Sequence, residues 1–265
     1  MRACALLAMV PACFQPPDFG PSGEQFVHFP AAAFQRGCVA DGEVTCPGDA
    51  TPLTTVQVVA FDLQRAEVTQ GEYDACVRRG DCAVPAAGYD PVGAPDLPVR
   101  GVPYRDAKLF CEHVAFTGSD GALHTGRLPT EAEWECAAGL CNPGAVFPWM
   151  YPWGNAAPAC AFANSPGCAS GVVPASAATA TARGLLDMAG NLREWVLDVY
   201  TTPYVGDVES PCFRCDEDPP DRRVTRGGSF RQDTSKLRVW ARAAEDPASL
   251  DDEHIGDVGV RCAAQ

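Results

Sequence analysis

The stretch of the chain whose residue types could best support catalysis or binding is "RGGSFRQDTSKLRVWAR", residues 226–242. It combines a Gly-Gly step, a serine and several arginines. Ser229 has no neighbouring base in the sequence, so its hydroxyl alone is weak evidence for nucleophilic catalysis. Arginine and tryptophan together can instead hold an anionic or planar ligand through bidentate and stacking contacts. A second interpretation stays open, in which Arg226, Arg238 and Arg242 pair with the chain's abundant carboxylates inside the fold.

The chain has fourteen cysteines in 265 residues, but none between Cys215 and Cys262. Structural zinc sites need paired ligands at short spacing, and only "CFRC", Cys212 to Cys215, has that spacing. The run "DEDPPD" that follows cannot open the helix that lowers a thiolate pKa in thioredoxin-like motifs. Disulfides are therefore the expected use of these cysteines, which indicates a compartment outside the reducing cytosol.

Composition and histidine placement argue against two further classes of function. The formal net charge is −14 and the pI is about 4.6, whereas binding to a phosphate backbone needs clustered lysine and arginine. A non-heme iron centre needs two histidines and a carboxylate brought together. The four histidines are scattered along the chain without such spacing: His28, His113, His124 and His254.

The N-terminus predicts export. "MRACALLAMVPAC", residues 1–13, resembles a bacterial lipoprotein signal in which Cys13 carries the lipid. The alternative is a mis-assigned start that truncates a longer signal. Either way we expect a cell-envelope lipoprotein or a secreted protein, in contact with a membrane only through that anchor, because no stretch approaches the roughly 20 apolar residues of a spanning helix. Residues 14–32 are expected to be a linker and residues 33–265 one domain.

Few regular elements are expected, because 24 prolines and 25 glycines favour turns. Residues 54–69 have the composition of a strand. A helix is predicted over about 70–79, with Thr69 as its N-cap and Glu72 completing a capping box.

Two more helices are predicted. Apolar residues at helical intervals indicate one over residues 104–116. The other covers residues 129–139, with Thr130 as N-cap and Glu133 at the third helical position. Beyond residue 140 the signals of regular structure fade. Three segments, 147–158, 163–171 and 210–223, have the composition of loops that disulfides and bound ions could order.

Several motifs occur together in a fixed order: "EVTQGEY" (67–73), "RLPTEAEWE" (127–135), "YPWGN" (151–155), "GLLDMAGNLREW" (184–195), "RGGSF" (226–230) and "GVRCA" (259–263). From about residue 33 to the end, the chain resembles the sulfatase-modifying-factor family, that of the formylglycine-generating enzyme. The resemblance implies an α+β fold related to C-type lectins, with little regular secondary structure and bound calcium. In the generating enzyme, two cysteines bind copper(I) and, with oxygen, oxidise a sulfatase cysteine to formylglycine. Other members are ligand-displaying lectin-like proteins or iron oxygenases with additional histidines.

The resemblance places calcium in "DMAGNLRE", because calcium takes six to eight oxygen ligands from a chain able to wrap round it. The corresponding ligands are the side chains of Asp187 and Glu194 and the carbonyls of Gly190 and Leu192. A turn with solvated carboxylates is the alternative. A second family site would use Asn164 and the Ser165 carbonyl, but its acidic ligand is missing here.

The positions that correspond to the copper cysteines are Gln232 and Leu237, and neither can supply the thiolate that copper(I) needs. Two other departures from the family pattern are Arg193, where a tryptophan is usual, and Asp257, where asparagine is expected. "RLPTEAEWE" is expected to be structural, since residues two apart on a helix do not share a face. By the resemblance, its arginine and glutamates bond neighbouring loops.

If Cys13 is the lipid anchor and Cys4 is removed with the signal, twelve cysteines remain. Very many pairings are open to twelve cysteines. Short loops favour the pairs Cys38–Cys46, Cys76–Cys82, Cys136–Cys141, Cys160–Cys168 and Cys212–Cys215. The resemblance implies a long-range bridge between the remaining two, Cys111 and Cys262.

Two functions therefore compete. The first is a monomeric, calcium-containing, non-oxidase binding module that holds a peptide, protein or glycan ligand and no copper. Its groove would be lined by Ser229, Arg231, Gln232, Arg238 and Trp240. The second is a formylglycine-generating or other oxidase acting on a sulfatase-type cysteine, with a metal site that the sequence does not reveal. The missing thiol pair favours the first.

Overall fold

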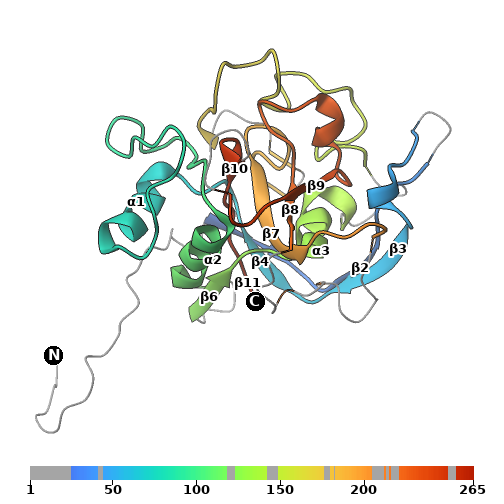
Figure 1. Ribbon diagram of the computed structural model, residues 1–265. Helices are drawn as coiled ribbons and strands as arrows, with labels where there is room; N and C mark the ends of the chain where they lie inside the picture. Colours follow the sequence, from blue (N-terminus) through green and yellow to red (C-terminus); the bar gives the residue numbers. More distant parts are fainter. Residues whose placement is uncertain are drawn as a thin grey trace, which may run out of the picture.

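Figure 1 shows the computed structural model of the chain, which describes residues 25–40, 44–117, 123–141, 149–175, 180–181, 183–204, 212, 215, 221–249 and 255–265. Cys4, Cys13, His254 and the expected signal segment 1–13 lie outside the described residues. Among the described residues, no helix combines the length and the apolar character that crossing a bilayer requires.

The first sheet has five strands and includes the C-terminus. In order across the sheet they are β1 (Phe26–Phe29), β4 (Phe61–Gln64), β11 (Ala263–Ala264), β6 (Leu123–Arg127) and β5 (Ala115–Thr117). Strand β11 lies antiparallel between β4 and β6, so the end of the chain occupies the middle of the sheet.

Strand β1 corrects the expected boundary between linker and domain. Its antiparallel pairing with β4 places Phe26 opposite Gln64 and Phe29 opposite Phe61. The rings of Phe29 and Phe61 stack at 4.9 Å. Because Phe29 is buried in the core, the folded unit includes residues 26–32, which the sequence placed in a linker.

The second sheet lies beyond residue 140, where the signals of regular structure fade. Its order is β10 (Val258–Gly259), β7 (Arg193–Val199), β8 (Arg223–Arg226) and β9 (Arg242–Glu245). Strand β10 runs parallel to β7, and the other pairs are antiparallel. The segments predicted as loops overlap this sheet only at Arg223. The strands themselves were not predicted, because they are stabilised by partners far away in sequence, which local composition does not show.

Residues 54–69 contain two strands rather than one. Strand β3 (Thr54–Val58) pairs with β2 (Ala32–Arg36) in a separate two-stranded sheet. The chain then breaks at Val59, whose side chain is exposed, and continues into β4 of the first sheet.

The three predicted helices are present. Helix α1 (Gln70–Arg79) begins at the Thr69–Glu72 capping box and ends at Gly80 in left-handed backbone, as predicted. Helix α2 (Tyr104–His113) ends earlier than expected, because residues 115–117 belong to strand β5.

Helix α3 (Glu131–Glu135) has the predicted Thr130–Glu133 capping box. It continues as a π-helical turn, Cys136–Leu140, so the predicted 129–139 helix is not uniform. In Figure 1, α1 and α2 lie on one side of the molecule, and α3 lies between the β7–β9 sheet and the β2–β3 pair. Trp134 of α3 is buried in the main apolar core.

All twelve cysteines among the described residues form disulfides, in the pairing that the sequence favoured: Cys38–Cys46, Cys76–Cys82, Cys111–Cys262, Cys136–Cys141, Cys160–Cys168 and Cys212–Cys215. The Cys111–Cys262 bridge links α2 to the C-terminal segment across a sequence separation of 151 residues. A loop of that size corresponds to about 5 kcal/mol in the chain-entropy account of disulfide stabilisation.

Candidate functional site

The Asp187 loop, residues 184–192, turns sharply before β7 begins at Arg193. Asp187 and Asn191 have positive φ values of 54° and 58°, and Gly190 has a φ of 79°. A Cβ atom on Gly190 would lie 2.5 Å from the carbonyl oxygen of Asn164. Only glycine therefore lets the loop approach residue 164 so closely, and the turns direct Asp187 into the interior.

Asp187 is a buried carboxylate without a hydrogen-bond partner. It is 3% exposed, and neither of its two oxygens has a partner. Burial raises the pKa of Asp187 to about 7, against the lowering effect of Arg261 and with a further increase from Glu194. Buried polar groups in proteins are almost always satisfied, so an unpaired carboxylate here has the character of a ligand.

Glu67 lies beside Asp187 and fixes the shape of the loop. Its two carboxylate oxygens accept hydrogen bonds from the backbone N–H of Leu192 at 2.9 Å and from Nδ2 of Asn191 at 2.6 Å. Burial, followed by the negative charges of Asp187 and Glu194, raises the pKa of Glu67 well above its ordinary value. Glu67 therefore brings a further carboxyl group to the site while its own oxygens are engaged.

Glu194 is the third carboxylate of the cluster. Its Oε1 accepts from Nε of Arg261 at 2.9 Å, and its Oε2 accepts from Nε1 of Trp134 at 2.7 Å. Arg261 also donates to the carbonyls of Gln64 and Leu186. Glu194 is fully buried, so its position is fixed by these contacts.

The cluster has an excess of negative charge. Three carboxylates, Glu67, Asp187 and Glu194, face a single guanidinium, Arg261. Two formal negative charges therefore lack a counterpart in a buried site, an arrangement that needs a cation or proton uptake. Asp187 offers two open oxygens, and each engaged oxygen of Glu194 keeps further lone-pair capacity. Carboxylate oxygens are the ligands that a divalent cation such as calcium takes, so these residues are candidates for such a site.

Asn164 faces the same region from another loop. Its Nδ2 donates to the carbonyl of Gly171 at 2.9 Å and to Oδ1 of Asn191 at 3.1 Å, while its own Oδ1 has no partner. The carbonyl of Ser165 accepts from the N–H of Cys168 in a local turn. Asn164 and Asp187 line one pocket of about 160 Å³, so the structure brings together side chains that the sequence assigned to separate sites.

The Gly-Gly-Ser loop, residues 226–242, contains a closed polar network. The hydroxyl of Ser229 donates to Oδ2 of Asp257, and Oδ1 of Asp257 accepts from Nε of Arg193 at 2.9 Å. Arg193 also pairs with Glu245 of β9. The two departures from the family pattern, Arg193 and Asp257, thus contact each other, and both are buried.

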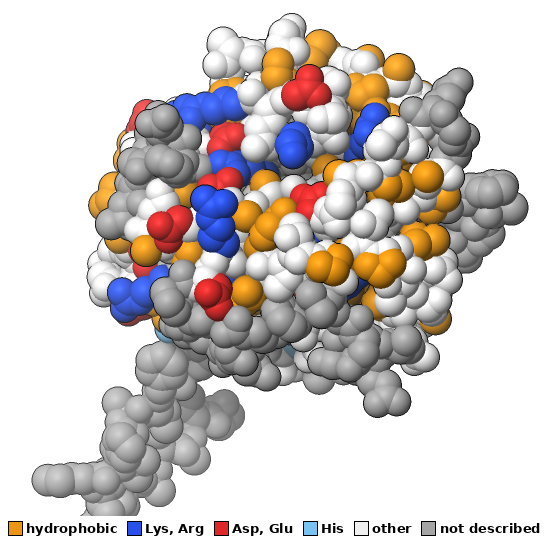
Figure 2. Space-filling view, turned by 45° about the vertical axis from the view of Figure 1, so that its right-hand side comes forward, with side chains coloured by type: hydrophobic (Ala, Val, Ile, Leu, Met, Phe, Trp, Pro, Cys, Tyr) orange, Lys and Arg blue, Asp and Glu red, His pale blue; other side chains and the backbone are white. Residues whose placement is uncertain are grey.

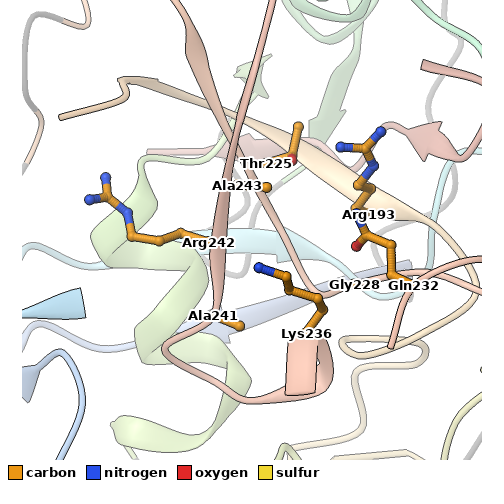
Figure 3. A pocket seen from close by; sticks show the side chains of 8 residues that line it. All are labelled: Arg193, Thr225, Gly228, Gln232, Lys236, Ala241, Arg242 and Ala243. Carbon is orange, nitrogen blue, oxygen red and sulfur yellow. The ribbon is translucent and has the colours of Figure 1, made fainter. Parts of the chain in front are cut away.

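Gln232 and Leu237, the positions that the sequence analysis matched to the copper cysteines, have different surroundings. Gln232 is half-buried and lines a pocket of only about 10 Å³, together with Arg193 and Lys236. Figure 3 shows this pocket, with Arg242 pointing away from it toward α3. Leu237 is 1% exposed and packs in an apolar cluster with Tyr151, Ala163 and Ala189.

The predicted ligand groove is not present as expected. Ser229 and Trp240 are buried, and Trp240 belongs to the apolar core. Among the predicted groove residues, Gln232 lines the pocket of Figure 3, while Arg231 is exposed beside the ring of Phe230. Trp240 was expected in the groove because it follows the turn in sequence, but its side chain packs inward. Figure 2 shows a face on which basic and acidic side chains are interspersed.

The glutamates of α3 have the structural role that was predicted. Glu133 makes a two-point contact with Arg127 at 2.7 Å for each bond. Glu131 pairs with Arg242 at 2.8 and 2.7 Å, and Glu135 pairs with Arg226. Two arginines of the Gly-Gly-Ser loop therefore anchor α3, as the second interpretation of that stretch proposed.

The described histidines do not gather into a metal site. Nδ1 of His28 lies 3.1 Å from Asp62, and those of His113 and His124 contact backbone carbonyls. Within the described residues, one group of three histidine, cysteine or carboxylate side chains has its ligand atoms within 4.8 Å of one another: Asp198, Cys212 and Cys215.

Sequence reasoning missed Glu67, Trp134 and Arg261 as neighbours of Asp187. All three lie in motifs that were recognised, "EVTQGEY", "RLPTEAEWE" and "GVRCA". For Glu67 and Arg261, the signal that could have found them is a charged residue next to apolar positions of the motif, since a buried charge needs a partner.

Comparison with known proteins identifies the family. Residues 15–265 match the sulfatase-modifying factor enzyme 1-like domain. The chain is 33% identical over 189 residues to the formylglycine-generating enzyme of Thermomonospora curvata, a match that covers 64% of this chain and 56% of that one. It is 35% identical over 160 residues to the hercynine oxygenase of Mycolicibacterium thermoresistibile, which covers 58% of this chain and 33% of the relative.

Both relatives extend well beyond the matched parts.

The fold is similar to that of PvdO from Pseudomonas aeruginosa, with a TM-score of 0.70, 23% identity and coverage of 91% of this chain and 94% of that one. The α+β fold with low helical content and many disulfides agrees with this likeness. The chain belongs to the sulfatase-modifying factor enzyme 1-like domain family.

Proposed function

We propose that this chain is a non-oxidase member of its family, an exported binding module for a peptide, protein or glycan ligand. The main support for this proposal is the kind of side chain found at the two positions that correspond to the copper cysteines. Gln232 offers an amide, and Leu237 is buried among apolar side chains. Copper(I) is bound by soft thiolate ligands, and neither side chain provides one.

The polar network beside these positions supports the same proposal. Arg193 and Asp257 replace the residues usual in the family, and each satisfies the other inside the protein. Ser229 donates its hydroxyl to Asp257. A catalytic serine or a substrate-binding cavity would need open hydrogen-bonding capacity, whereas these groups are engaged with one another around a pocket of about 10 Å³.

Export is supported by the cysteines, because twelve paired cysteines fit an oxidising compartment. We propose a lipid anchor at Cys13, a monomeric state and no nucleic-acid partner, in line with the net charge of −14. Ligand contact is then expected at the exposed part of the Gly-Gly-Ser loop, Arg231 and the half-buried Gln232 and Arg238. Binding of the full chain to peptide and glycan arrays, compared with an Arg231→Ala variant, would locate that contact.

A second candidate is an oxidase. The matched relatives named above are a formylglycine-generating enzyme and a hercynine oxygenase. The direct test incubates the purified full chain with copper, oxygen and a peptide that carries the sulfatase cysteine motif. We expect no formylglycine in the peptide by mass spectrometry, because no thiol pair is present at the family positions. Formylglycine formed at a rate above that of the metal alone would establish the oxidase instead.

We further propose calcium as a structural ion in the Asp187 loop. The excess of two negative charges and the two open oxygens of Asp187 support it. Asp187 and Glu194 would hold the ion through side chains, with the carbonyls of Gly190 and Leu192 as the further ligands that the family pattern implies. Asn164 and Ser165 are proposed only as contributors from the adjacent loop. The ion would neutralise the cluster and fix the loop that leads into β7.

A further inference from the structure

A buried carboxylate lies beside the Cys212–Cys215 disulfide. Asp198, on strand β7, is 1% exposed. Its Oδ2 lies 3.6 Å from Sγ of Cys212. One ligand atom from each of Asp198, Cys212 and Cys215 lies within 4.8 Å of the others, a group that occurs once among the residues that the structure describes.

Asp198 is held in place from the opposite side. The backbone N–H of Glu131, the first residue of α3, donates to the same Oδ2 at 2.6 Å. Such an outer contact is what orients a metal-ligating carboxylate in known sites. The position of this oxygen is therefore set by the fold and does not depend on the sulfur atoms.

The carboxylate favours the reduced form of the cysteine pair. A disulfide sulfur carries no proton, so it cannot donate to Oδ2 of Asp198. After reduction, the thiol of Cys212 can donate, and a hydrogen bond to a charged acceptor is among the stronger ones in proteins. Both cysteines are half-buried, so a small dithiol can reach them.

We propose that Cys212, Cys215 and Asp198 form a reducible zinc site. A dithiol reductant transfers two electrons, so that the Cys212–Cys215 bond breaks, two thiols form and the reductant becomes a disulfide. Zinc then replaces the two thiol protons and is bound by two thiolates, one carboxylate oxygen and a water molecule. In a tetrahedral zinc site, sulfur and oxygen ligands lie about 3.5 Å apart, close to the 3.6 Å between Cys212 and Asp198.

The site is independent of the proposed binding function. It lies on β7 and on the two cysteines, away from Gln232 and Leu237, and it requires a reductant that the oxidising compartment does not supply by default. A reducing dithiol would therefore convert a covalent link into a metal site.

The test uses the purified full chain, reduced stepwise with a dithiol and then treated anaerobically with cobalt(II) as a spectroscopic substitute for zinc. We expect Cys212 and Cys215 to be alkylated first in mass spectrometry. A thiolate-to-cobalt charge-transfer band should then appear, and zinc should displace it. The variant Cys212→Ser/Cys215→Ser should lose the band, and Asp198→Asn should weaken cobalt binding at least about tenfold.

The matched control is Cys76→Ser/Cys82→Ser, which removes another short-loop disulfide, at the end of helix α1. Neither of its sulfur atoms belongs to a comparable group of three ligands among the described residues, so this variant should keep the cobalt band. A band that survives in Cys212→Ser/Cys215→Ser would overturn the proposal. So would cobalt affinity that is unchanged in a folded Asp198→Asn variant.

Discussion

The Asp187 loop and the Gly-Gly-Ser loop both carry recognisable motifs, but they differ in how their buried polar groups are paired. In the Asp187 loop, three buried carboxylates face one guanidinium, and Asp187 has no hydrogen-bond partner. In the Gly-Gly-Ser loop, Ser229, Asp257 and Arg193 satisfy one another. In our proposal, the unbalanced site takes a cation, and the self-satisfied one has lost the copper chemistry of the family.

The largest expected effect comes from breaking the balanced site. The substitution Arg193→Met removes the partner of Asp257 and Glu245. Leaving such carboxylates unpaired should cost about 3–5 kcal/mol of unfolding free energy, measured by urea denaturation. Adding Asp257→Asn should recover part of this loss, with a coupling energy of about 0.5–3 kcal/mol.

The control for Arg193 is Arg78→Ala, which breaks the exposed pair between Arg78 and Asp74. That change should cost no more than about 1 kcal/mol. If Arg193→Met were as mild as Arg78→Ala, the network would not have the stabilising role assigned to it.

A smaller effect is expected from removing the ion of the unbalanced site. Chelation by EGTA should lower the unfolding temperature, since a ligand at a hundredfold its dissociation constant contributes about 2.7 kcal/mol. Asp187→Asn should make the chain insensitive to EGTA in differential scanning calorimetry, and the exposed control Asp96→Asn should retain the response. An equal response in the Asp187 variant would place the calcium elsewhere.

The stability of the metal-free protein should depend on pH through Asp187. Burial raises the pKa of Asp187 from 3.8 to about 7, so the folded state binds its proton more tightly than the unfolded state. The stabilisation from that proton is complete below about pH 4 and is lost as the pH rises through about 7. The urea midpoint of the metal-free chain should therefore fall between about pH 4 and pH 7 by an amount that the Asp187→Asn variant does not show. If the original chain gained stability relative to that variant as the pH rises, the raised pKa of Asp187 would be contradicted.

The smallest effect is expected at Gln232. Its side chain is half-buried at a pocket of about 10 Å³, so Gln232→Ala should change the unfolding free energy by at most about 0.5 kcal/mol. Metal content should be unchanged as well. A loss of bound metal in this variant would show that the position still has a role in metal binding.

Local sequence signals predicted the local structure well. The capping boxes of Thr69 with Glu72 and of Thr130 with Glu133 are formed within one helical turn, so the sequence alone defines them. The short-loop disulfides are also local. Helix α2 was predicted too long because the competing pairing of residues 115–117 with β6 is not local.

Long-range pairing accounts for what the sequence did not reveal. Strands β7 to β10 are stabilised by partners in distant segments, such as Glu194 opposite Arg226. The contact between Arg193 and Asp257 joins residues 64 positions apart. Each was recognised as a departure from the family pattern, but only the fold shows that the two substitutions compensate each other.

Our central proposal is that this chain retains the calcium loop and has lost the copper site. The most direct measurement is elemental analysis of the full chain, purified without reductant or chelator, with a count of free thiols mapped by mass spectrometry. The account predicts bound calcium, no copper and no free thiol among the twelve cysteines from Cys38 to Cys262. Stoichiometric copper, or two reactive thiols in the folded protein, would contradict it.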